Sequence, residues 1–109
     1  MATFPASPIG PPETLEERFN RLVETWKSET AYLSNSTKIH GHPAYQEIIR
    51  MGEPAVPLLL RRMEQHPDHF GHALHAITGA QPIPMEHAGN IPKIAEDWVR
   101  WGRENGYRW

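Results

Sequence analysis

A series of histidines spaced three residues apart is the most unusual chemical feature of this 109-residue chain. His66, His69, His72 and His75 lead from a turn into an expected helix over residues 69–78. On that helix His69 and His72 lie on neighbouring turns, and His66 approaches from the turn before it, which supplies enough ligands for zinc. Helical zinc motifs more often use histidines four residues apart with a supporting carboxylate. We therefore expect no metal and no cofactor, and keep His66, His69 and His72 as the alternative metal-ligand set.

A second candidate for chemistry is an arginine and a histidine separated by four residues. Arg61 and His66 have a spacing that resembles the RNA-cleaving motif of HEPN domains, which are also small and helical. The resemblance implies a ribonuclease in which His66 acts in general acid/base catalysis. Pro67 follows His66 directly and places it at a helix end, and this pair of residue types arises easily by chance. A HEPN-like ribonuclease and a histidine-ligated metal hydrolase form the enzymatic alternative for function.

The composition excludes several other classes of function. Charged residues are 22% of the chain and hydrophobic residues 39%, and the net charge of −2 leaves no electrostatic footprint for nucleic acid. No apolar run approaches the length of a membrane span, so we expect no membrane partner. The absence of cysteine excludes disulfides, a thiolate nucleophile and a cysteine-based zinc site. We therefore expect a cytoplasmic protein.

The elements that must position these residues are all expected to be helical. Thr14 and Glu17 match a capping box at the start of the first and longest helix. No segment alternates apolar and polar residues long enough to predict a strand. Four prolines in residues 1–12 predict a disordered arm, and residues 13–109 a single helical domain. Helical periodicity and capping residues predict five helices, near residues 15–32, 44–51, 54–65, 69–78 and 91–104. Asp68 is the predicted N-cap of the fourth helix and Gly79 its predicted C-cap, and residues 34–37 are expected to end the first helix.

The turn between the second and third expected helices organises the rest of the chain. Gly52 ends one helix, and Pro54 opens the next after a one-residue break. The helix that follows carries a predicted buried face at the spacing i, i+3, i+4, i+7, formed by Val56, Leu59, Leu60 and Met63.

This turn also carries a family resemblance. Residues 48–60, in which a helix ends at glycine and the next opens with alanine, valine, proline and paired leucines, look like the centre of a HEAT repeat. Residues 73–79, followed by Trp98 and Trp101, are similar to a bacterial variant of that repeat. The resemblance implies an all-α, five-helix, HEAT-like right-handed stack, in which two repeats stand where about three are usual. Its parts are a long N-terminal capping helix at 13–33 and two hairpins at 42–66 and 68–105.

HEAT-like repeats bind proteins more often than they catalyse reactions, so the resemblance implies a non-enzymatic adaptor in a bacterial cytoplasm. Its partner is expected to be another protein or a second copy of the chain. In such a hairpin the second face of the third helix lies on the partner-binding side, and a tryptophan on the fifth helix adds to it. The expected partner-binding residues are Leu58, Arg61, Arg62, Gln65 and Trp101. The alternative for this face is that Leu58 packs under the first helix and the arginines are simply solvated.

Overall fold

The computed structural model describes residues 13–109, apart from the side chain of Ser36, and in this part of the chain all regular secondary structure is helical, with no strand. The predicted proline-rich arm, residues 1–12, lies outside the described residues. All five expected helices are present, together with one further helix and two short 3₁₀ turns. The elements are α1 (Leu15–Thr30), α2 (Ser36–His40), α3 (Pro43–Met51), η1 (Glu53–Ala55), α4 (Val56–Gln65), α5 (Gly71–Thr78), η2 (Met85–His87) and α6 (Ile91–Glu104).

Helix α1 begins where the local sequence predicts. The Thr14 hydroxyl accepts a hydrogen bond from the Glu17 amide at 3.0 Å, and the Glu17 carboxylate accepts one from the Thr14 amide at 2.8 Å. This capping box satisfies two amides that the helix itself leaves without partners. One face of α1 is then buried, including Phe19, Val23 and Trp26.

The short helix α2 was not expected. The cluster around Asn35 predicted only the end of the preceding helix, yet the Asn35 side chain also caps α2 by accepting from the Lys38 amide. Five residues are too few to show an apolar period or to form a stable helix alone. The helix is held by a distant contact instead, because the buried Trp26 indole donates to the Ile39 carbonyl at 2.8 Å.

The central turn has the expected glycine but a different entry into the next helix. Gly52 has φ of 72°, a conformation that glycine adopts without steric cost, and its amide donates to Ile49 to close α3. Pro54 then lies in the 3₁₀ turn η1, so α4 begins at Val56 and not at Pro54. Pro57 still falls in the first turn of α4, where its missing amide costs little.

Helix α5 begins two residues later than predicted and without the predicted cap. The Asp68 carboxylate accepts from the His69 amide and pairs with Lys27 of α1 at 2.7 Å, so it does not cap α5. The Tyr45 hydroxyl takes over part of that role by accepting from the Ala73 amide at 2.9 Å. At the other end, Gly79 is left-handed, as predicted for a helix C-cap.

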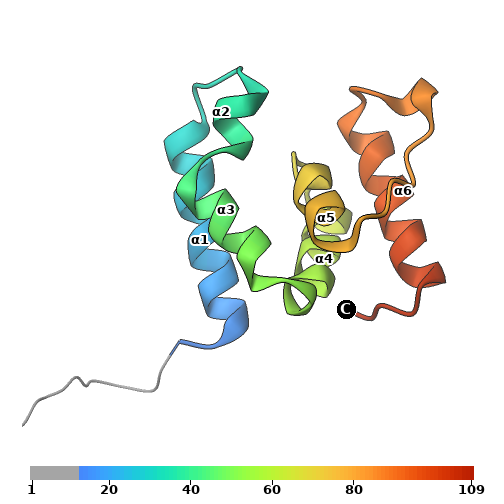
Figure 1. Ribbon diagram of the computed structural model, residues 1–109, viewed down its shortest axis with the longest axis horizontal. Coiled ribbons are helices and arrows are strands. Elements are labelled where there is room, and N and C mark those ends of the chain that lie inside the picture. The colour runs from blue at the N-terminus through green and yellow to red at the C-terminus, as the bar shows by residue number, and fades with distance from the viewer. Residues whose placement is uncertain (1–12) are drawn as a thin grey trace, which may run out of the picture.

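The helices form a row with α1 at one end and α6 at the other (Figure 1). Helix α3 packs against α1 and α5, and α4 packs against α6, whereas α3 and α4 meet mainly through η1. One continuous core runs through these contacts. Its largest fully buried side chains are Trp26, Trp98, Tyr45, Phe19, Phe70, Ile48, Leu59, Leu60, Met63 and Leu74.

No helix in residues 13–109 combines the length and apolar character needed to cross a membrane.

Candidate functional site

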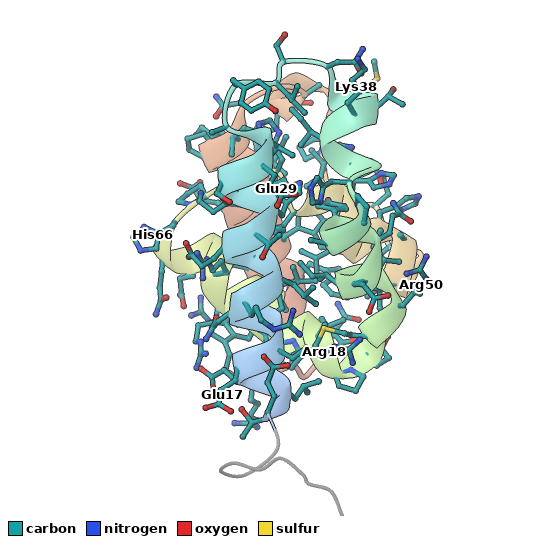
Figure 2. The ribbon with its side chains drawn as sticks, turned by 90° about the vertical axis from the view of Figure 1, so that its left-hand side faces the viewer. Glu17, Arg18, Glu29, Lys38, Arg50 and His66 are labelled. Atoms are coloured by element: carbon teal, nitrogen blue, oxygen red, sulfur yellow. The ribbon has the colours of Figure 1, made fainter. Side chains whose placement is uncertain are left out.

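The histidine series does not form the alternative metal site. His66 is exposed at the C-terminal end of α4 and points away from the molecule beside α1 (Figure 2). His69 and His72 lie instead with His40 of α2. Within residues 13–109, no group of three or more histidine, aspartate or glutamate side chains is placed to hold a metal ion. The set of His66, His69 and His72 is therefore not assembled.

The histidines that do come together form a stack on Tyr45. The His40 ring lies parallel to the His72 ring, with centroids 4.6 Å apart, and it also stacks on Tyr45 at 5.2 Å. Tyr45 and His72 are themselves neighbours, with centroids 6.1 Å apart. His69 is a third neighbour, 6.4 Å from His40. No local pattern predicts this cluster, because His40 precedes His72 by 32 positions.

Burial and like charge make this stack sensitive to protonation. Burial, and then the neighbouring His72 and His69, lower the pKa of His40 below its ordinary value. Burial also raises the pKa of the Tyr45 phenol, whose hydroxyl donates a hydrogen bond to the His69 carbonyl at 2.8 Å. Among the described residues, these histidines belong to no group that is placed to hold a metal ion. The arrangement is therefore a packing contact between α2, α3 and α5 rather than a ligand set.

Arg61 and His66 have different surroundings. The Arg61 guanidinium donates to the Glu16 carboxylate of α1, and His66 is exposed beyond the end of α4. Among the described residues, no hydrogen bond joins either side chain to the other. A HEPN-like cleavage site, which needs both groups beside one groove, stays a prediction without a supporting contact.

The expected partner-binding residues fall into two separate places. At about 100° per residue, Leu58, Arg61, Arg62 and Gln65 share one face of α4, and that face is turned toward α1 because Arg61 and Arg62 pair with Glu16 and Glu24. Leu58 is partly buried against the core.

Trp101 lies on α6, edge to face with Trp98 at 5.3 Å and beside Tyr107 at 5.4 Å. The structure therefore brings together the four residues of α4 but not Trp101.

The opposite face of α4 forms a groove with α6 that the sequence did not reveal. The groove has a volume of about 530 Å³. Met63, Ala95 and Val99 form its buried floor, and Pro67 and Pro92 stand where α4 ends and α6 begins. Its rim is charged, with both signs present, and is formed by Glu64, Glu96, Arg100, Arg103 and Glu104.

One wall of the groove is ordered by the end of the chain. The Trp109 indole donates to Glu64 at 2.8 Å, and the Arg103 guanidinium lies 5.0 Å from the centre of the Trp109 ring while also pairing with Glu64. Hydrogen bonds from Trp109 and then Arg103 lower the pKa of Glu64. Glu96 and Glu104 are exposed on the rim, and no ion pair joins them to another described residue.

Comparison with protein-family models, with curated proteins and with solved structures finds no match to this chain. The residues of the chain itself therefore carry the functional proposal.

Proposed function

We propose that this chain is a non-enzymatic protein-interaction module, a short HEAT-like adaptor, and that it binds its partner in the groove between α4 and α6. The observation that carries the proposal is the groove itself, with an apolar floor and a charged rim. A binding site of this kind places apolar contacts at its centre and polar contacts around them, as protein interfaces do. The groove lies between the third and fifth predicted helices, but on the face of α4 opposite to the expected partner-binding residues.

The groove fits an amphipathic helix of the partner better than an extended peptide. An extended peptide needs free backbone groups to pair with, and the groove is lined by the side chains of two helices. Apolar residues of the partner, spaced three or four apart, would contact Val99 and the prolines that flank the floor. Basic residues of the partner would pair with Glu96 and Glu104 of α6, and an acidic residue would pair with Arg100 of the same helix.

The packing of the ends also supports a HEAT-like adaptor. A stack with two repeats must have its apolar ends covered. Helix α1 covers one side by packing along α3, as a capping helix would. Helix α6 lies at the other end of the row (Figure 1). The groove is formed between α6 and α4. A bacterial cytoplasm as the location is part of the proposal, and the absence of cysteine from the sequence supports a reducing compartment.

The test is a comparison of three tagged chains as baits: the wild type, a Glu96→Arg/Glu104→Arg variant and a Lys38→Glu variant. The first two differ only at exposed rim positions. Lys38 is exposed on α2, which lies near the end of the row opposite to α6 (Figure 1). We expect one partner in stoichiometric amount with the wild type and with Lys38→Glu, and its loss with the rim variant. Equal recovery of that partner by all three chains would contradict the proposed site. Size-exclusion chromatography of the purified chain would show whether the partner is a second copy.

A further inference from the structure

A second and larger pocket lies on the other side of α6, away from the groove. It has a volume of about 690 Å³, is open to solvent, and is lined by residues of α5, the loop after α5 and the first half of α6. This volume is within the range of small-molecule sites. Gly71, His72, His75, Ile83, Ile94 and Trp98 are among its lining residues.

The pocket holds a hydrogen-bond donor that has no protein acceptor. The indole N–H groups of Trp26 and Trp109 donate to Ile39 and Glu64, whereas that of Trp98 has no acceptor among the described residues. The Trp98 side chain is only 1% exposed. Among the described residues no fully buried side-chain nitrogen or oxygen lacks a hydrogen-bond partner, so the Trp98 indole nitrogen keeps a small accessible area. Trp98 is one of the residues that line the pocket. An unpaired donor in such a place favours a ligand that accepts a hydrogen bond.

Gly71 keeps that donor accessible. A Cβ atom at this position would lie 3.1 Å from the Trp98 indole nitrogen and 3.5 Å from Ile94. Glycine here is not required by a left-handed backbone, because Gly71 is the first residue of α5 and is not among the glycines with positive φ. The missing side chain therefore leaves open the approach to the indole N–H.

The remaining polar groups of the pocket set the charge of the ligand. The His75 Nδ1 lies 2.9 Å from the Ala80 carbonyl, which can only accept, so the neutral ring carries its proton on Nδ1 and leaves Nε2 as an acceptor. No lysine, arginine, aspartate or glutamate is among the lining residues. Without an opposite charge to pair with, a charged ligand would lose hydration and gain little in return. Ile83 and Ile94 are partly exposed and offer apolar surface.

We propose that this pocket binds a small, uncharged aromatic compound whose carbonyl or similar acceptor takes the hydrogen bond of the Trp98 indole. The apolar walls hold the ring of the ligand, and Trp98 orients it. The site is independent of the groove between α4 and α6.

The test uses acetophenone as the uncharged probe and benzoate as a charged probe of similar size, at a pH slightly above neutrality. The readout is the indole ¹H–¹⁵N resonance of Trp98, assigned by its absence from the spectrum of Trp98→Phe. We expect acetophenone to move this resonance in a saturable way, with a dissociation constant of about 1 mM or tighter. Benzoate is expected to bind at least about tenfold more weakly than acetophenone. The absence of a saturable shift with acetophenone, or equal binding of the two probes, would overturn the proposal.

A pair of variants locates the binding. Gly71→Ala places a methyl group beside the indole nitrogen and should weaken acetophenone binding about tenfold. Ala76→Val adds volume to an exposed position of the same helix that does not line the pocket, and should leave binding unchanged. Ile83→Trp fills the pocket from the loop after α5 and is the alternative blocking variant if Gly71→Ala disturbs α5. Undiminished binding to a folded Gly71→Ala or Ile83→Trp chain would show that the probe binds elsewhere.

Discussion

The hydroxyl of Tyr45 is expected to contribute more to stability than its size suggests. It lies on α3, its residue is fully buried, and it joins two backbone groups at the start of α5. It donates to the His69 carbonyl at 2.8 Å and accepts from the Ala73 amide at 2.9 Å. Helix α5 has no side-chain cap of its own at Phe70, so this hydroxyl satisfies an amide that would otherwise have no partner.

The variant Tyr45→Phe removes the hydroxyl and keeps the ring. The ring contacts with Trp26 and Phe70, at 5.2 and 6.3 Å between centroids, are then retained. The variant leaves the buried Ala73 amide without an acceptor, and a buried unpaired group costs about 1–3 kcal/mol. The His69 carbonyl is only partly buried, so water can replace its lost donor at a smaller cost. We expect the free energy of unfolding to fall by about 2 kcal/mol.

The assay is urea denaturation followed by tryptophan fluorescence, with Tyr107→Phe as the matched control. The Tyr107 hydroxyl donates to Glu53 at 2.6 Å, but this hydrogen bond is exposed. Its loss should change the free energy of unfolding by no more than about 0.5 kcal/mol. The expected loss of about 2 kcal/mol for Tyr45→Phe corresponds to a drop in Tm of about 8–16 °C for a domain of this size. Equal effects of the two variants, or no measurable effect of Tyr45→Phe, would refute the assigned role of Tyr45.

Three further predictions concern the core and two titrating groups. Leu59→Ala should lower the free energy of unfolding by about 2–5 kcal/mol because Leu59 is fully buried. Arg61→Ala should cost much less in the same urea titration, and equal losses would mean that the faces of α4 are reversed. Burial acts to raise the pKa of Asp97, but hydrogen bonds from an arginine and a histidine outweigh it and hold that pKa below its ordinary value of 3.8. Asp97 therefore stabilises the fold above pH 3.8, and this contribution is lost as the pH falls further. Asp97→Asn should cost about 1–3 kcal/mol at neutral pH and flatten the acid dependence of Tm; an unchanged acid dependence would contradict this. The pKa of His40 is lowered from 6.5, so the unfolded chain binds that proton more readily and stability falls as the pH drops through 6.5. His40→Phe keeps a ring in the stack and should reduce the loss of Tm between about pH 7.5 and 5.5, and a loss as large as in the wild type would rule out His40 as its source.

The elements that the sequence predicted correctly are those set by local interactions. The capping box of Thr14 and Glu17 and the left-handed Gly79 involve residues close together in the chain. Local signals also predicted five helices and their buried faces. They could not predict α2, because its stabilising contact joins Trp26 to Ile39 across the loop.

Contacts between distant parts of the chain determine the cap of α5 and the two candidate binding sites, so the sequence did not predict them. Asp68 is a favourable cap residue, but Lys27 of α1 pairs with its carboxylate, and a distant tyrosine caps α5 instead. The groove between α4 and α6 and the pocket lined by Trp98 form only when helices from different parts of the chain pack together. Single-helix periodicity identified the face of α4 that pairs with α1, and no pattern within α4 could indicate that α6 would leave a groove on the other face.

The most direct test of the proposed function is the affinity of the isolated partner for two charge-reversal variants of this chain. Glu96→Arg/Glu104→Arg changes the rim of the groove, and Arg62→Glu changes the face of α4 that pairs with α1. Isothermal titration should show binding weakened at least about tenfold by the rim variant and nearly unchanged by Arg62→Glu. The reverse pattern, with affinity lost in Arg62→Glu and kept in the rim variant, would contradict binding in the groove.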